Sequence, residues 1–350
     1  MQTHIVVPAD VQLLPLRHEH RVGHGAVAHS HLPLSCSERL EPTPCPRQQM
    51  HRQRRPTLLT VLMRSGELEI TDLLWPLDEA GARLPVVQAE AVSLLSDRGQ
   101  HGAARILARM PSRDGCVDEA YLDALAVRVH HELQRLGEEL QMDRRVAALL
   151  EGPLRLLQAS GTGPVRVVDV GCGTGHVVRA VAAHRHFSPD VELVGVDLNP
   201  VLIDEARRLA RLESLDCEFV TGDAFAPGIA ITDPARTIVI STGLLHHLGE
   251  ADLTELFTVQ ARLGVAGFAH WDIAPCMWST VGAWLFHQAR MREPVSRHDG
   301  VLSARRAHSA QTLLAAARAA AAGYAPTVLE GPRWYPRALD VLRPIVGTLS

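Results

Sequence analysis

The chain has 350 residues, a formal net charge of −4 and no lysine, since all 35 basic residues are arginine. Chemistry that requires a lysine, such as Schiff-base formation, pyridoxal-phosphate catalysis and the standard P-loop, is therefore excluded. The low net charge without a long basic run argues against a nucleic-acid partner. There is no apolar run of about 18 residues to predict a membrane span, and six scattered cysteines favour a reducing, cytoplasmic location.

Residues 1–62 differ in composition from the rest of the chain. Histidine, proline, arginine and small residues alternate there, and three prolines between residues 42 and 46 interrupt any regular element. Because no repeating apolar face is available for burial, we expect a dispensable, disordered extension. The His-x-His spacing that begins at His18 is compatible with metal binding. A flexible tail, or translated sequence upstream of a start at Met63, is the favoured interpretation, so no metal site is predicted.

Residues 63–158 are predicted to form a helical accessory segment. Apolar residues recur at helical spacing from Leu122 to Leu140, which indicates one continuous buried stripe. His130 and His131 are expected on a half-exposed helix face, and the start of a zinc H-E-x-x-H motif at His131 fails at Arg135. The helices are expected over residues 85–97, 118–140 and 144–157.

The most informative stretch is Val165-Arg166-Val167-Val168-Asp169-Val170-Gly171-Cys172-Gly173-Thr174-Gly175. Its β-branched apolar part predicts a strand that is covered on both faces. The glycines allow a sharp turn and a close approach to a ligand, and a helical pattern begins at His176. A strand, a glycine-rich turn and a helix N-terminus together predict a nucleotide pocket.

The spacing of the glycines distinguishes between nucleotides. The dinucleotide fingerprint G-x-G-x-x-G, counted from Gly171, would require a third glycine where His176 stands. Asp169 lies two residues before the first glycine, where a carboxylate would crowd a pyrophosphate and would suit a ligand that carries an ammonium group. The pattern therefore disfavours a dinucleotide.

Further strands and helices alternate after the glycine turn. The strand at residues 191–197 ends in Asp197, which is placed to accept hydrogen bonds from ribose hydroxyls. A Gly-Asp pair at the exit of the third strand places Asp223 where it can accept from an adenine amine. Later strands are expected over residues 217–225, 237–242, 267–272, 325–330 and 337–343, and helices over 201–212, 252–261 and 309–322.

Three of these motifs, taken in order, resemble class I S-adenosylmethionine-dependent methyltransferases. They are the D-x-G-x-G-x-G turn at Asp169, the G-D-A match at Gly222, and Ser241-Thr242-Gly243-Leu244-Leu245-His246-His247-Leu248. The last resembles the small-molecule branch that includes ubiquinone- and menaquinone-type enzymes. The resemblance covers about residues 160–345. It implies a doubly wound, Rossmann-like α/β sheet of seven strands, the last antiparallel, in a domain at 159–350.

The same resemblance implies S-adenosyl-L-methionine as the cofactor and a set of residues around it. The cofactor-binding residues it implies are Asp169, Gly171, Cys172, Gly173, Gly175, Asp197, Leu198, Asp223, Ala224, Phe225 and Ser241. Asp169 would position the amino acid end, Asp197 the ribose and Asp223 the adenine, with Phe225 lying on the ring.

The acceptor is expected beyond the ends of the fourth and fifth strands. His246 or His247 is the candidate catalytic residue, because a histidine near its ordinary pKa accepts a proton at neutral pH; helix capping and pocket lining are the alternative. His270 and Trp271 are expected to line the same pocket. An insert at 273–308 with several aromatic residues is expected to close over it as a lid, or to pack on the core as a helix.

The acceptor itself is expected to be a small molecule. The N-P-P-Y type of signature that marks amino-group methylation is absent after the fourth strand, which favours oxygen or carbon. Two other function classes stay open, namely a nicotinamide-dependent oxidoreductase and a non-catalytic protein that binds S-adenosylmethionine. A homodimer is also left open.

Overall fold

The computed structural model describes residues 67–349, except 79–80, 321–322, 333 and 337–339. The expectations for residues 1–62, including the spacing at His18 and a start at Met63, lie outside the described residues. None of the helices in the described part combines the length and apolar character needed to cross a bilayer.

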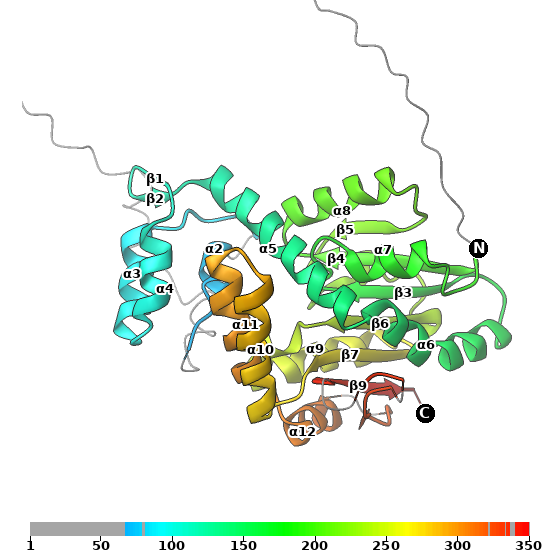
Figure 1. Cartoon of the computed structure of the whole chain (residues 1–350). Helices are drawn as coiled ribbons and strands as arrows, with labels where there is room; N and C mark the ends of the chain where they lie inside the picture. Colours follow the sequence, from blue (N-terminus) through cyan, green and yellow to red (C-terminus); the bar gives the residue numbers. More distant parts are fainter. Residues whose placement is uncertain (1–66, 79–80, 321–322, 333, 337–339, 350) are drawn as a thin grey trace, which may run out of the picture. The chain divides into compact units, whose positions relative to one another are not determined.

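The described residues contain a sheet of seven strands in the order β5-β4-β3-β6-β7-β9-β8 (Figure 1). All pair in parallel except β9, which is antiparallel to both of its neighbours. The strands are β3 (Val165–Val170), β4 (Val191–Asp197), β5 (Glu218–Thr221), β6 (Thr237–Thr242), β7 (Gly267–Ile273), β8 (Thr327–Val328) and β9 (Leu342–Thr348). The fold class expected from the sequence is thus confirmed. The strand order reverses between β3 and β6, where open α/β sheets bind ligands.

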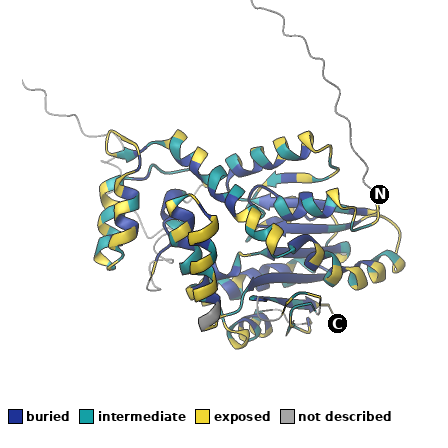
Figure 2. Cartoon of the chain, viewed as in Figure 1, coloured by how far each residue is buried: buried dark blue, intermediate teal, exposed yellow. Residues whose placement is uncertain are grey.

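Helices cover both faces of the sheet, so the strands lie almost entirely in the buried layer (Figure 2). Val165 and Val167 pack with one group of helices, and Val168 and Val170 with the other, as alternation along a strand requires. The first face is covered by α6 (Met142–Ala159), α7 (His176–Ala183) and α8 (Pro200–Leu212); the second is covered by α9 (Glu250–Leu263) and α12 (Ala310–Ala320).

The last strand lies further along the chain than the sequence predicted. The prediction placed it at 337–343, whereas β9 begins at Leu342 and continues through Pro344. A proline inside a strand normally leaves a ladder hydrogen bond unmade. Here Pro344 lies opposite Trp271, whose carbonyl accepts the N–H of Gly243 at 2.8 Å. The carbonyl is therefore satisfied although Pro344 has no N–H.

A separate apolar cluster holds the N-terminal helices together. It contains Leu68, Ile70, Leu95, Leu107 and Leu125, and it also includes Val295 from the C-terminal half of the chain. Its elements are α2 (Thr71–Leu74), α3 (Gln88–Asp97), α4 (His101–Ala108), the hairpin of β1 (Ser112–Arg113) and β2 (Cys116–Val117), and α5 (Glu119–Glu139). The sequence analysis foresaw α3, α5 and α6 but neither α4 nor the hairpin. The domain boundary at residue 158 stays a prediction.

The buried stripe of α5 departs from the expected one after Val129. Leu133 is 41% exposed, whereas Glu132 is only 5% exposed. The Glu132 carboxylate accepts the backbone N–H groups of Arg292 at 2.6 Å and Glu293 at 3.2 Å, at the start of the next helix. These bonds offset the cost of burying a charge. The continuous apolar stripe was therefore a wrong prediction for its second half.

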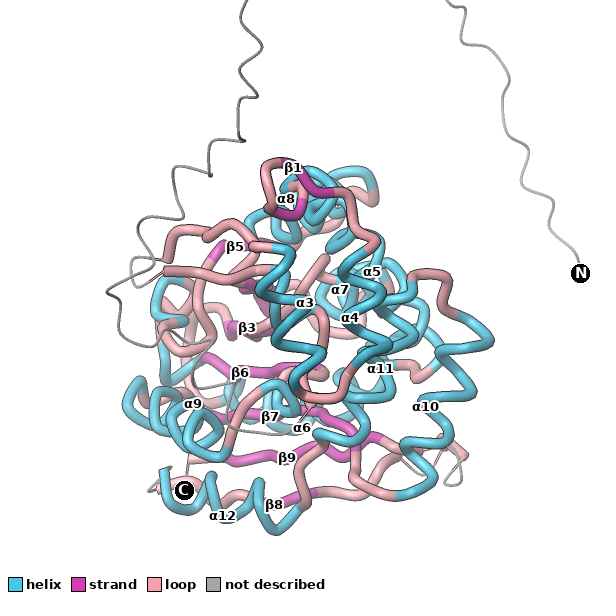
Figure 3. The backbone as a smooth tube through the Cα atoms, turned by 90° about the vertical axis from the view of Figure 1, so that its left-hand side faces the viewer, coloured by secondary structure: helices cyan, strands magenta, loops and turns pink. Residues whose placement is uncertain are grey.

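The segment at 273–308 folds as two helices, α10 (Met277–Arg290) and α11 (Pro294–Arg306). Helix α11 buries Val295 and Leu302, so it is a packed part of the fold and not an irregular loop. Trp284 on α10 is 52% exposed, which agrees neither with a pocket lining nor with packing on the core. Helix α11 packs against α10 and also contacts α4 and α5 (Figure 3).

Candidate functional site

The turn after β3 has the conformation that its glycines predict. Gly171, Gly173 and Gly175 have φ of +72°, +56° and +71°, in the left-handed region that side chains with a Cβ avoid. The N–H groups of Gly171 and Cys172 both donate to the carbonyl of Val196, at 2.8 and 3.0 Å. The turn is thus fastened to the neighbouring strand β4.

Replacing Gly175 with alanine is expected to destabilise the protein by about 2–4 kcal/mol, because strain at positive φ adds to a clash. A Cβ at Gly175 would lie 2.2 Å from the buried ring of Phe219. Urea unfolding measures the loss. Gly228→Ala is the matched control, since no heavy atom lies within 4 Å of its Cβ position. Equal stability of the two variants would contradict the packing described for the turn.

Asp197 connects the tip of β4 to the glycine turn. Its carboxylate accepts the N–H of Gly173 at 2.8 Å through Oδ2 and the N–H of Asn199 at 2.9 Å through Oδ1. The side chain of Asn199 in turn caps α8 by accepting the N–H of Val201. One carboxylate therefore fixes both the turn and the start of α8; its contact with ribose stays a prediction.

Asp169 is a buried acid without a hydrogen-bond partner in the described part of this region. It is 1% exposed, and neither carboxylate oxygen has a hydrogen-bond partner among the described residues. Burial, with a smaller contribution from Asp197, raises its pKa to about 8. A buried acceptor without a donor is costly unless a ligand supplies one. The position beside the glycine turn fits the ammonium group of an amino acid such as the methionine end of S-adenosylmethionine.

The pKa of Asp169 predicts a distinct pH dependence of stability. Because the folded-state pKa of about 8 lies above the ordinary aspartate pKa of 3.8, the folded protein retains a proton that the unfolded chain loses between these pH values. Stability of the ligand-free protein therefore falls as pH rises through this window and levels off above it. Relative to Asp169→Asn, the wild type is expected to lose roughly 3–4 kcal/mol between pH 5 and pH 8. Denaturant unfolding of both proteins at each pH gives this difference; a difference that does not vary with pH would refute the assignment.

The remaining predicted cofactor residues occupy different environments. Asp223 is exposed and its Oδ1 accepts the N–H of Phe225 at 2.9 Å, so it shapes the turn after β5. Ala224 and Phe225 are half-buried beside the second core cluster, Leu198 is 42% exposed, and Cys172 is half-buried. The side chains around the turn and the tips of β4 and β5 thus share one edge of the sheet.

Ser241 lies inside the core instead. It is fully buried, and its hydroxyl is 2.9 Å from Nδ1 of His270, whose Nε2 is 3.1 Å from the side-chain oxygen of Gln260. Burial lowers the pKa of His270 to about 3, so the ring is neutral. His270 and Trp271 are both buried core residues, and their expected place in the acceptor pocket is wrong. Both faces of β7 are covered, which leaves neither side chain accessible.

His130 of α5 lies against the glycine turn, which the sequence analysis missed. A Cβ on Gly173 would be 2.4 Å from the His130 ring, and Nδ1 of that ring lies 2.8 Å from the carbonyl of Ala126. Burial lowers the pKa of His130. The sequence offers one weak signal, namely that His130 follows Val129 on the buried stripe. His130 was expected on a half-exposed face of its helix. Its ring instead lies against the glycine turn and forms part of the candidate site.

His246 is held rigidly at the end of β6 on the short 3-10 helix η4 (Leu245–His247). It is 7% exposed, and its backbone N–H donates to Oδ2 of Asp272 at 2.9 Å. Its ring Nδ1 lies 2.8 Å from Oδ1 of the same carboxylate, which is buried at the end of β7. Just before η4, Leu244 comes within 3.2 Å of the Cβ position of Gly171. The histidine pair therefore lies beside the glycine turn.

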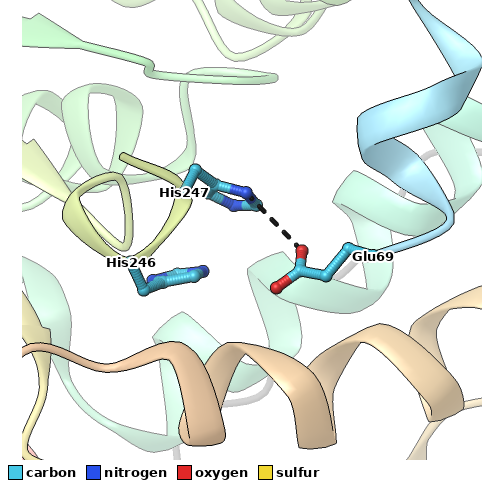
Figure 4. A group of neighbouring side chains, drawn as sticks. All are labelled: Glu69, His246 and His247. Atoms are coloured by element: carbon cyan, nitrogen blue, oxygen red, sulfur yellow. Dashed lines mark ion pairs between the residues drawn. The ribbon is translucent and has the colours of Figure 1, made fainter. Parts of the chain in front are cut away.

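His247 is surrounded by carboxylates from the N-terminal segment. Its Nδ1 lies 3.5 Å from Oε2 of Glu69 (Figure 4). The same nitrogen lies 3.4 Å from Oδ1 of Asp72. Burial by itself would lower the pKa of His247, but Glu69 and Asp72 raise it to about 9. The two carboxylates thus favour a positive charge at this position. No local motif signals Glu69 and Asp72, because the contact spans about half of the chain.

The sheet order, the left-handed glycine turn and the acids at the ends of β3 and β4 are the features expected of a class I S-adenosylmethionine-dependent methyltransferase domain. Comparison with known families agrees, since residues 167–264 match the model of a methyltransferase domain. Residues 167–264 are therefore similar to a methyltransferase domain, and the cofactor that this similarity indicates is S-adenosyl-L-methionine.

Similar proteins span different parts of the chain. A 24-methylenesterol C-methyltransferase 2 from Oryza sativa subsp. japonica is 35% identical over 102 residues, which is 29% of this chain and 23% of that protein. An uncharacterised 37.1 kDa protein in a transposon of Streptomyces fradiae is 25% identical over 213 residues, covering 59% of this chain and 55% of that protein. The chain thus matches about a quarter and about half the length of these relatives. A magnesium protoporphyrin IX methyltransferase from Synechocystis, solved with bound S-adenosylhomocysteine, is 16% identical over 75% of this chain and 100% of that one, with a TM-score of 0.41.

Proposed function

We propose that this protein transfers the methyl group of S-adenosylmethionine to an oxygen or carbon atom of a small molecule. The observation that carries the proposal is the buried, unpartnered carboxylate of Asp169 beside a turn of three left-handed glycines. An ammonium group of the ligand would give this carboxylate a charged donor. A nicotinamide dinucleotide would instead bring a pyrophosphate toward the same acid.

The residues that would hold the cofactor lie along the ends of β3, β4 and β5. Asp169 would bind the amino acid end, Asp197 the ribose, and the turn at Asp223 the adenine. Close approach would come from the glycines at 171, 173 and 175, and Cys172, Leu198, Ala224 and Phe225 would line the surface around them. When bound, S-adenosylmethionine supplies a methyl group on a positively charged sulfonium, so the protein mainly has to hold donor and acceptor in line.

The acceptor would be bound beside the ends of β6 and β7. His130 against the glycine turn and the pair His246 and His247 on η4 approach this region from different parts of the chain. The histidine pair would act on the acceptor, with Asp272 fixing the orientation of His246. The sequence after β6 is Ser241-Thr242-Gly243-Leu244, without the pattern that marks amino-group methylation, which supports oxygen or carbon as the methylated atom.

Heat stability in the presence of candidate ligands tests the cofactor. S-adenosylhomocysteine at about 100 times its dissociation constant is expected to raise the melting temperature by roughly 5–10 °C, because it binds only the folded state. NAD is expected to leave it unchanged. Stabilisation by NAD alone would make the protein an oxidoreductase and overturn the proposal.

Methyl transfer itself is tested with S-adenosylmethionine that carries a labelled methyl group. The labelled donor is incubated with the protein and mixtures of phenols, enols and enolisable ketones, and label is expected in an acceptor. Asp197→Ala serves as the control, because it alters the proposed cofactor site and leaves the residues of the proposed acceptor site unchanged. Binding of S-adenosylhomocysteine without label in any acceptor would favour a non-catalytic binding protein.

A further inference from the structure

We propose that Glu69, His246 and His247 form a binding site for a divalent transition-metal cation beside the acceptor position. One ligand atom from each residue lies within 4.8 Å of the others. No metal ligands were predicted from the sequence, and Glu69 is separated from the histidines by about half of the chain. The inference rests on the proposed function for the purpose of the site, whereas cation binding can be measured without it.

The spacing of the three side chains suits a single ion. Nδ1 of His247 is 3.5 Å from Oε2 of Glu69, close to the separation of about 3.3 Å between two ligands of a tetrahedral ion with bonds of about 2.0 Å. The rings of His246 and His247 have centroids 4.3 Å apart. Figure 4 shows Glu69, from the segment before α2, pointing toward the two imidazoles of η4. The ligands therefore come from two segments that are distant in sequence.

The carboxylate of Asp272 holds the His246 ring from behind, as a carboxylate often does for a histidine that binds a metal. Its buried carboxylate is 2.8 Å from Nδ1 of the ring, so this nitrogen carries the hydrogen and Nε2 carries the free lone pair. A carboxylate behind a ligating histidine fixes the tautomer and increases its basicity. Asp272 is also fixed itself, because it accepts the backbone N–H groups of His246 and Ile273.

The charges around the site leave room for a divalent cation. The side chains of Glu69, Asp72 and Asp272 are 2%, 7% and 4% exposed. Arg306 is the guanidinium that faces them, at 2.5 Å from Asp72 and 3.6 Å from Glu69. When both imidazoles are neutral, as metal ligands must be, three carboxylates and one guanidinium leave two negative charges in a buried region. Buried charges require a partner, and a divalent cation supplies the compensating charge.

The donor set indicates the class of ion. Two imidazoles and one carboxylate suit Zn²⁺, Fe²⁺ or Co²⁺ better than Mg²⁺ or Ca²⁺, which prefer oxygen ligands. Three protein ligands leave at least one coordination position open. An acceptor hydroxyl or enol bound there would lose its proton more readily. The acceptor class that fits the site is accordingly an oxygen compound that can ligate a metal.

A second group of histidines supplies the control. Asp143, His184 and His186 also lie within ligand distance of one another, but both rings approach the same oxygen, Oδ2 of Asp143, at 2.7 and 2.9 Å. His184 has a side chain that is 62% exposed. This cluster is explained by two hydrogen bonds to one carboxylate, and any cation that it binds must be counted separately.

The test is a titration of the full-length protein with Co²⁺ after removal of metals by a chelator, followed by visible absorption and by calorimetry. Wild type and His184→Gln are each expected to bind one equivalent of Co²⁺ at the site of Glu69, His246 and His247. Glu69→Gln and His247→Gln are expected not to bind this equivalent. Asp272→Asn is expected to keep that equivalent with affinity reduced about 10- to 100-fold. The proposal is overturned if Glu69→Gln and His247→Gln bind as many equivalents as wild type with the same affinity.

Affinity for S-adenosylhomocysteine, measured in the same samples, separates this inference from the proposed function. Each variant is expected to bind it within about threefold of wild type, which also shows that the variant is folded. Normal S-adenosylhomocysteine binding without the shared cation equivalent in wild type would overturn the metal site alone. Loss of S-adenosylhomocysteine binding by the wild-type protein would overturn the proposed function.

Discussion

Replacing Asp197 with alanine is expected to weaken binding of S-adenosylhomocysteine by about 10- to 100-fold. The variant has no carboxylate to accept the charge-assisted hydrogen bonds of the ribose hydroxyls, which are worth roughly 1.5–3 kcal/mol. The N–H of Gly173 would also lose the acceptor that Asp197 provides, so the glycine turn would become less ordered. Both losses act on the cofactor, and calorimetry with the folded variant measures their sum.

Asp204→Ala is the matched control for this change. Asp204 is on the neighbouring helix α8, its side chain is 75% exposed, and its partner is Arg207 at 3.2 Å. It removes the same charge from the same region without touching the turn, and affinity is expected to stay within about twofold, as for an exposed pair. An unchanged affinity in folded Asp197→Ala would remove Asp197 from the cofactor site.

Replacing Asp299 with alanine is expected to lower the free energy of unfolding by about 3–5 kcal/mol. Asp299 is 6% exposed and accepts the N–H groups of Ile70 and Thr71 and the Thr71 hydroxyl, each at 2.9 Å. The variant would leave these donors unsatisfied in a buried place, and each hydrogen bond to a charged group is worth about 1.5–3 kcal/mol. Urea unfolding measures the total, and hydrogen exchange at Ile70 and Thr71 shows where protection is lost.

Glu67→Ala tests the same junction at its exposed edge. Glu67 pairs with Arg305 of α11 at 3.0 Å, and the two side chains are 47% and 51% exposed. Solvent screens such a pair, so the expected loss is at most about 1 kcal/mol. If Asp299→Ala cost no more than Glu67→Ala, α11 would not be what holds the N-terminal segment in place.

The cofactor half of the molecule could be predicted from sequence because its signals are local. The bounds of β3, β4 and β6 match the predicted strands, and the left-handed glycines follow a strand whose apolar residues are consecutive. Asn199-Pro200 likewise marks the start of α8 through a side-chain cap. Each of these features depends on residues within a few positions of one another.

The acceptor half could not be predicted because its contacts are long-range. Glu69 meets His247, Glu132 meets the start of α11, and neither pair has a spacing that a sequence pattern encodes. Ser241 and His270 were misplaced for a related reason, since motif position did not indicate which face of a covered strand each side chain occupies. Pro344 ended a predicted strand that in fact continues, because the compensating hydrogen bond comes from Gly243.

The junction between the segment at 67–74 and α11 has a consequence for the order of events during synthesis. The N–H of Ile70 donates to a carboxylate 229 residues later, so it has no native acceptor until α11 has left the ribosome. By then β3 to β7 and the glycine turn have already emerged and can pair. Contacts of such long sequence separation form late and slowly. The glycine turn and the neighbouring strand ends are therefore expected to form first in the newly made chain. A cofactor bound there can stabilise the incomplete sheet before the segment at 67–74, which contains Glu69, packs against α11.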